Sequence, residues 1–95
     1  MKDGKFKSLV VDTYKKYKES DTLFGVLYSA ISTYGFSEIL DIEEFAQTSG
    51  ADMLHLQSGN VNIDIYEFDL LDYRIESEKN VINIKLRNKE VTISY

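Results

Sequence analysis

The chain of 95 residues contains no cysteine and no proline, and it has one histidine and five glycines. The lack of cysteine excludes disulfides and thiolate metal ligands, and it fits a reducing compartment. A single histidine excludes a multi-histidine metal site. No apolar run approaches the ~20 residues of a membrane-spanning helix, and the short run after the first lysines is interrupted at Asp12, unlike a secretory signal. We therefore expect a cytoplasmic protein that needs no metal or other cofactor.

The chain is 43% hydrophobic and 28% charged, which is ordinary for a globular protein. Its length corresponds to one domain. The pattern of apolar residues changes along the chain, from helical spacing in the first half to alternation in the second. We therefore predict a single α+β domain over residues 1–95, with a helical half at about 5–48 and a sheet half at about 53–95.

The first half reads as two or three helices. Phe6, Val10 and Tyr14 recur at helical spacing and predict a helix over 5–19. Asp21 is a suitable N-cap for a second helix ending at Gly35, as a left-handed C-cap. The apolar stripe of that helix would comprise Leu23, Phe24, Leu27, Ala30, Ile31 and Tyr34. Asp41 and Glu44 form an aspartate version of the capping box before a short helix over 42–48, with Gly50 as its stop.

The second half alternates between apolar and polar residues in four runs, over 61–66, 71–76, 82–87 and 91–95. Such alternation is typical of antiparallel strands with one dry face and one wet face. Residues 53–57 could add a further strand. We therefore predict a four- to five-stranded antiparallel meander sheet, with the N-terminal helices packed on its dry face to bury it.

Charge is unevenly distributed along the chain, whose net charge is −5. Residues 1–18 hold six lysines and two acidic residues, and residues 79–95 hold four basic residues and one acidic residue. Between them, residues 19–78 hold thirteen acidic residues and only Arg74 as a basic one. A negative surface of this kind speeds association with a positively charged partner. Two other readings stay open, namely that the charge serves solubility alone or is cancelled by lysines from the chain ends.

The densest acidic group surrounds a tyrosine, a residue type enriched in binding hot spots. The candidate partner-binding residues are Asp64, Tyr66, Glu67, Asp69 and Asp72, with Glu43 and Glu44 as a second patch. Asp64 and Glu67 would point to opposite faces of a strand, which argues against a shared metal ion. We therefore expect a small acidic, non-enzymatic binding protein. It would inhibit or neutralise a basic, nucleic-acid-handling protein, as an immunity protein or a phage anti-defence protein does.

Two alternatives remain. If the strand over 91–95 lies at a sheet edge, its unpaired backbone favours a homodimer, and the protein would be a self-associating assembly accessory. Residues 45–51 resemble the first helix and turn of a helix-turn-helix, but the recognition helix at 52–58 would carry no Lys or Arg, so nucleic acid is an unlikely partner. No Gly-x-Ser-x-Gly sequence and no phosphate-binding glycine loop is present, so we expect no enzyme.

Overall fold

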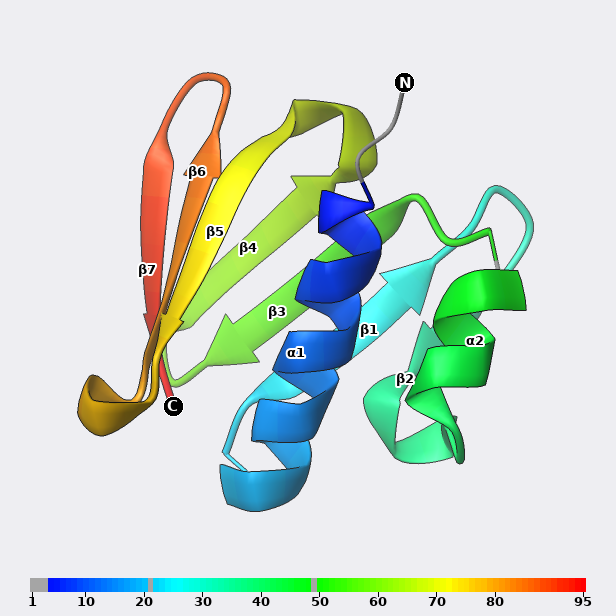
Figure 1. Ribbon diagram of the computed structural model, residues 1–95, viewed down its shortest axis with the longest axis horizontal. Helices are drawn as coiled ribbons and strands as arrows, with labels where there is room; N and C mark the ends of the chain where they lie inside the picture. The colour runs from blue at the N-terminus through cyan, green and yellow to red at the C-terminus, as the bar shows by residue number, and fades with distance from the viewer. Residues whose placement is uncertain (1–3, 21, 49) are drawn as a thin grey trace.

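The computed structural model describes residues 4–20, 22–48 and 50–95, and it combines helices with two antiparallel sheets. Helix α1 (Lys5–Ser20) comes first. A four-stranded sheet follows, in the spatial order β2-β1-β3-β4, and a three-stranded sheet in the order β5-β6-β7 completes the described chain (Figure 1). The strands are β1 (Phe24–Tyr28), β2 (Thr33–Gly35), β3 (Met53–Ser58), β4 (Val61–Tyr66), β5 (Leu70–Glu76), β6 (Val81–Leu86) and β7 (Glu90–Ser94).

Short helical segments make the remaining connections. The 3-10 turn η1 (Phe36–Glu38) and helix α2 (Ile42–Thr48) lie between β2 and β3. The 3-10 turn η2 (Glu67–Asp69) carries the chain from one sheet to the other, and η3 (Ser77–Lys79) joins β5 to β6. Among the described residues, no helix is long and apolar enough to cross a membrane.

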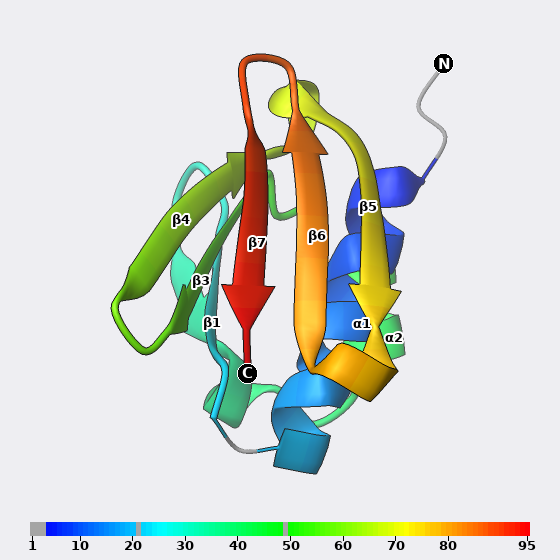
Figure 2. The same cartoon turned by 90° about the vertical axis from the view of Figure 1, so that its left-hand side faces the viewer.

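The core lies between α1 and the inner faces of the two sheets. Helix α1 contacts β1 of one sheet and β5 of the other, while β7 contacts β3 (Figures 1 and 2). Phe6, Leu9 and Val10 of α1 are buried at the helical spacing that the sequence predicts. Burying a Leu, Ile or Val side chain contributes about 1.5–3 kcal/mol. The sheets supply the other side chains, chiefly Leu27, Leu54, Leu56, Ile63, Ile65, Ile82, Ile84, Leu86 and Ile93.

Several predictions of local structure are confirmed. The helices begin and end within a residue of the predicted bounds, and Asp41 caps α2, because its Oδ1 accepts the Glu44 N–H at 3.1 Å. Gly50 has φ +66°, as expected of a residue that ends a helix. The predicted runs 53–57, 61–66, 71–76, 82–87 and 91–95 correspond to strands β3 to β7 within a residue or so at each end. Most of their apolar residues are on the inner faces, whereas Val61 and Leu71 are exposed.

The predicted second helix is wrong. Residues 24–28 and 33–35 form β1 and β2, and Gly35 has φ −80° rather than a left-handed conformation; the proposed N-cap Asp21 lies outside the described residues. The physical reason is that β1 is apolar on both faces, so its residues satisfy a helical spacing as well as an alternating one. Gly25 also requires the absence of a side chain, because the Phe36 ring occupies the position that a Cβ would take.

The single meander sheet is also wrong. The chain turns a corner at η2, so β3 and β4 join β1 and β2, while β5, β6 and β7 form their own sheet. The two dry faces therefore bury each other as well as α1, an arrangement that leaves less sheet surface for the helices to cover. Helix α2 packs beside α1 instead of on the predicted meander.

Candidate functional site

The outer face of the four-stranded sheet is rich in aromatic side chains. We call it the aromatic face and define it by the outward residues Phe24, Val26, Tyr28, Met53, His55, Gln57, Asn62, Asp64 and Tyr66. Phe24, Tyr28 and Tyr66 are 50%, 41% and 43% exposed. In Figure 2, α1 lies on the opposite side of this sheet, and no other described element is drawn over the outer side. Exposed aromatic groups that share one face are a feature of binding surfaces.

Strand register places these side chains in rows. Tyr28 of β1 lies opposite Met53 of β3, which lies opposite Tyr66 of β4. Neighbouring strands are ~4.8 Å apart, so the two tyrosines flank Met53 at roughly 10 Å from each other. This row is apolar in its centre and carries a hydroxyl at each side, a composition suited to a partly wet interface.

The next row centres on a histidine–aspartate pair. His55 of β3 lies between Val26 of β1 and Asp64 of β4, its two cross-strand neighbours. The distance between His55 Nδ1 and Asp64 Oδ1 is 2.6 Å. The histidine side chain is 28% exposed and the aspartate 54%. The hydrogen bond fixes the orientation of the imidazole and leaves Nε2 as the ring nitrogen available to a partner. His55 can donate a hydrogen bond to a polar partner, and Asp64 can accept one. The pair supplies only two potential metal ligands, and no group of three His, Cys, Asp or Glu residues that could hold a metal ion occurs in the described chain.

The aromatic face continues into the corner between the sheets. Phe68 of η2 is 71% exposed, and its ring centroid lies 5.6 Å from that of Tyr66. Arg87 holds this corner, because its Nε donates to the Phe68 carbonyl at 2.8 Å and its backbone N–H to the Asp69 carbonyl at 3.0 Å. The corner therefore presents an exposed aromatic pair from a turn that is tied to the second sheet.

Charge separates the two halves of the molecule. Residues 19–73 contain no lysine and no arginine, and this segment includes the whole four-stranded sheet and α2. Among the residues that the structure describes, the lysines and arginines lie on α1 and on the segment from Arg74 onward. Asp52 is exposed and extends the β3 ladder, because its N–H donates to the Tyr28 carbonyl and its carbonyl accepts the Glu67 N–H. This end of the domain is acidic, whereas the α1 side mixes both signs.

The structure brings together only some of the predicted partner-binding residues. Asp64 and Tyr66 lie on the aromatic face, and Glu67 and Asp69 continue into η2. Asp72 belongs to the other sheet, where it lies opposite Lys85 and 3.7 Å from Lys5 Nζ. The acidic group around Tyr66 is therefore split, and its last member is internally neutralised.

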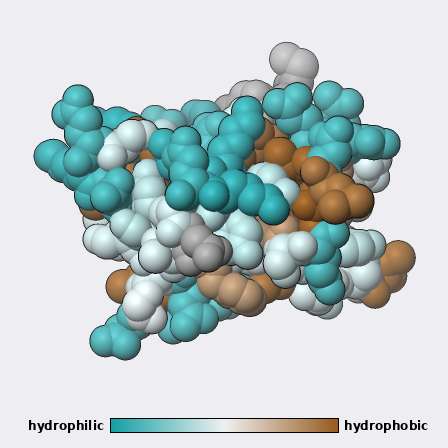
Figure 3. All heavy atoms as spheres, turned by 90° about the horizontal axis from the view of Figure 1, so that it is seen from below, coloured by the Kyte–Doolittle hydropathy of each residue, from teal (hydrophilic) through white to brown (hydrophobic). Residues whose placement is uncertain are grey.

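The second predicted patch lies on α2. Glu43 is 3.4 Å from Lys15 of α1, so a lysine from the basic N-terminal segment does cancel part of the acidic charge. Glu44 lines a shallow groove with Tyr34, Leu40 and Phe45, and Leu40 is fully exposed. In the view from below, apolar surface gathers on the side where β2 and α2 lie, whereas the side under the three-stranded sheet is mainly hydrophilic (Figure 3).

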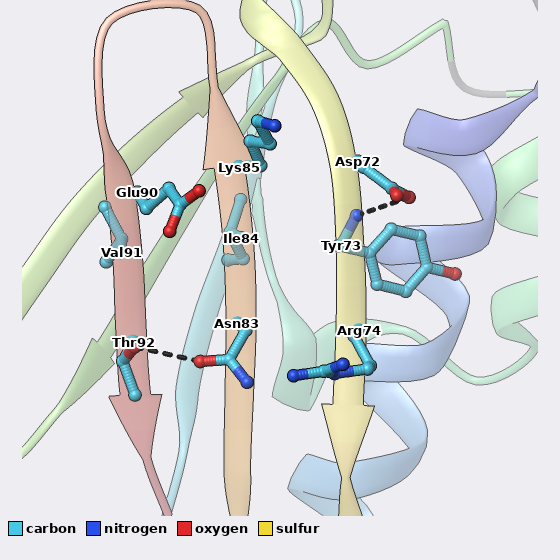
Figure 4. Close-up of a pocket in the computed structure, with 9 residues that line it drawn as sticks. All are labelled: Asp72, Tyr73, Arg74, Asn83, Ile84, Lys85, Glu90, Val91 and Thr92. Atoms are coloured by element: carbon cyan, nitrogen blue, oxygen red, sulfur yellow. Dashed lines mark hydrogen bonds between the residues drawn. The ribbon is translucent and has the colours of Figure 1, made fainter.

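The outer face of the three-stranded sheet carries a shallow hollow lined by charges of both signs. A shallow cavity of about 370 Å³ lies over it (Figure 4). Asp72, Lys85 and Glu90 alternate in sign across the three strands, and the Thr92 hydroxyl donates to Asn83 Oδ1 at 2.9 Å. This outer face mixes both charge signs, which leaves the aromatic face as the better candidate site.

Tyr73 joins this sheet to α1. Its hydroxyl donates to Asp12 Oδ2 at 2.6 Å. Burial, and then the hydrogen bond to this carboxylate, raise the pKa of Tyr73 well above that of a free tyrosine. Tyr73 is therefore a structural link and keeps its proton.

Sequence reasoning missed Phe24 and Phe68 and gave His55 no role. The helical prediction places Phe24 on a buried stripe, and because residues 24–28 are apolar on both sides, the sequence shows no alternation there that predicts an exposed strand face. The fold and this face define a small α+β domain with an uncovered aromatic sheet surface on its acidic side. No protein-family model, no curated protein and no solved structure matches the chain.

Proposed function

We propose that this chain is a small acidic binding protein, not an enzyme, that inhibits or neutralises a basic, nucleic-acid-handling protein. The observation that supports this most is the coincidence of the aromatic face with a 19–73 segment that lacks Lys and Arg. Proteins that bind nucleic acid present clustered Lys and Arg to phosphates. An acidic surface with exposed aromatic rings is complementary to such a cluster.

The recognition chemistry follows from the side chains present. Tyr28 and Tyr66 offer ring faces to arginine guanidinium groups, which stack on aromatic rings with about 0.5–2 kcal/mol per contact. Asp64 supplies a carboxylate for charge-assisted hydrogen bonds, and it is already oriented by His55. Phe24, Val26 and Met53 provide apolar area that a partner would bury. Inhibition would result from covering the partner's phosphate-binding residues.

A helix-turn-helix DNA reader receives no support. Residues 53–58, which would contain the recognition helix, form β3 of the sheet. The surrounding surface carries no basic side chain within 19–73 to contact phosphates.

Affinity capture from the native cell tests this proposal with two variants of equal charge change. Asp64→Lys reverses a charge in the centre of the aromatic face, while Glu78→Lys makes the same reversal on exposed η3 of the other sheet. We expect a basic partner to be captured by the wild type and by Glu78→Lys, and to be lost with Asp64→Lys. A site-specific electrostatic interface would be contradicted if the amount of captured partner did not change as the salt concentration is raised. It would also be contradicted if both variants weakened capture equally.

A further inference from the structure

Strand β7 is an open edge of the three-stranded sheet. It pairs with β6 alone, and the paired residues run from Lys85 opposite Glu90 to Val81 opposite Ser94. Leu86 N–H donates to the Lys89 carbonyl, and Tyr95 N–H donates to the Asn80 carbonyl. Hydrogen-bonded pairs alternate along an antiparallel ladder, so Val91 and Ile93 direct their backbone groups toward β6. The N–H and C=O groups of Glu90, Thr92 and Ser94 therefore face the free edge.

These edge groups have no partner in the described chain. No backbone hydrogen bond outside the β6–β7 ladder reaches Glu90, Thr92 or Ser94. The edge also lacks the usual protections against strand addition, since it contains neither proline nor lysine nor an irregularity in its register. Its only charge, on Glu90, lies opposite Lys85 in the neighbouring strand.

We propose that β7 pairs with β7 of a second copy of this chain, in an antiparallel register centred on Thr92. This register places Glu90 opposite Ser94 of the second copy and Thr92 opposite its counterpart. Every outward N–H of one copy then meets an outward C=O of the other. On the inner face, half-buried Val91 comes opposite buried Ile93 of the second copy, so the apolar face continues across the junction.

Charge favours the β7 edge over the β4 edge as the site for a second copy. Strand β4 ends the four-stranded sheet, and its outward residues are Asn62, Asp64 and Tyr66. The equivalent self-pairing there would place Asp64 directly opposite its own counterpart, and like charges in that position are destabilising. The central outward residue of β7 is the uncharged Thr92, and Glu90 faces Ser94 in the proposed register, so β7 suits an identical chain better than β4, whose central outward residue is Asp64.

The dimer would join two three-stranded sheets into one and carry an aromatic face on each copy. It is independent of the proposed function, because the aromatic face belongs to the other sheet. A monomer that still captures the basic partner would refute the dimer alone, and a dimer without such a partner would refute the proposed function alone.

Cross-linking tests the register, because the chain contains no cysteine of its own. Facing Cα atoms in a hydrogen-bonded antiparallel pair are about 5.5 Å apart, within the range that a disulfide spans. Thr92→Cys should therefore form a covalent dimer on mild oxidation. Ser94→Cys, also exposed on the same strand, should not, because it faces Glu90 of the other copy. Equal cross-linking of the two variants, or none with Thr92→Cys, would overturn the register.

Sedimentation equilibrium tests the edge itself. Thr92→Pro removes an outward N–H without touching the bonds to β6, and it should raise the dimer dissociation constant roughly tenfold or more, since each copy loses one hydrogen bond. Asn62→Pro makes the same change on the β4 edge and should leave the dimer intact. Thr92→Lys, which sets like charges opposite each other, weakens the dimer without demanding a proline backbone. A wild-type chain that is monomeric at all concentrations would refute the proposal.

Discussion

Gly25 is the position at which one added carbon atom should be most damaging. A Cβ placed there would lie 2.1 Å from Phe36 Cε2 and 2.3 Å from Cδ2, whereas carbon atoms pack at about 3.5–4.0 Å. The Phe36 ring has little room to retreat, because it is buried and its centroid is 5.4 Å from that of Tyr14 and 5.8 Å from that of Tyr17. Relief would require the ring or β1 itself to shift by more than an ångström.

Overpacking a well-filled core costs typically 1–3 kcal/mol, and a clash this deep belongs at the upper end, so we expect Gly25→Ala to lower the free energy of unfolding by about 3 kcal/mol. For a chain of this size, the melting temperature should fall by roughly 10–20 °C. Urea denaturation and thermal melting followed by circular dichroism would measure both quantities.

Gly35 provides the matched control. It lies in the neighbouring strand with φ −80°, and an added Cβ would meet nothing closer than Glu38 Oε2 at 3.6 Å. Gly35→Ala should therefore stay within about 0.5 kcal/mol of the wild type or gain slightly, because alanine restricts the unfolded chain. Phe36→Leu should recover part of the loss in the Gly25→Ala background. The reasoning fails if Gly25→Ala and Gly35→Ala unfold at the same urea concentration.

Four further substitutions test polar contacts. Tyr14→Phe should lower the free energy of unfolding by about 1–3 kcal/mol, because it leaves the buried Ile39 carbonyl without the Tyr14 hydroxyl that donates to it at 2.6 Å. Tyr95→Phe should leave the stability unchanged or raise it, because the buried Tyr95 hydroxyl has no partner within the described residues. Urea denaturation would compare the two variants. Because the pKa of Tyr73 is raised in the folded state, the folded chain keeps a proton that the unfolded chain loses near pH ~10, so the free energy of unfolding falls above that pH. This fall should be shallower in Tyr73→Phe. Equal slopes of the free energy of unfolding against pH in the two proteins would contradict the role of Tyr73. Asp41→Ala should lower stability by about 1 kcal/mol by removing the α2 cap, as read by thermal melting.

The strands after residue 50 were predictable because each has one apolar face and one polar face. Ile63 and Ile65 alternate with Asn62 and Asp64, and the structure buries the first pair and exposes the second. The corner at η2 was not predictable in the same way. It depends on which dry faces meet, and that is decided by packing between residues far apart in the chain.

The error over residues 24–28 has the same origin as the candidate site. Leu27 is buried, but Phe24 and Tyr28 on the other side of the strand are exposed. A strand that is apolar on both faces has no clear alternation, so its period resembles that of a helix. The exposed aromatic residues that we propose for binding are therefore the reason why β1 lacks the alternation typical of a strand. Asp64 and Tyr66 were predicted because the residues of β4 alternate regularly.

The single crossing between the sheets has a consequence for how the chain can be divided. All strand pairing of the first sheet lies within residues 24–66, and all pairing of the second lies within residues 70–94. A cut at the exposed corner around Phe68 would break no ladder and would sever only the covalent tether between two self-contained sets of strands. Co-expressed as fragments, the two pieces should reassemble through α1 and the apolar inner faces, which makes this corner a natural position for a split reporter.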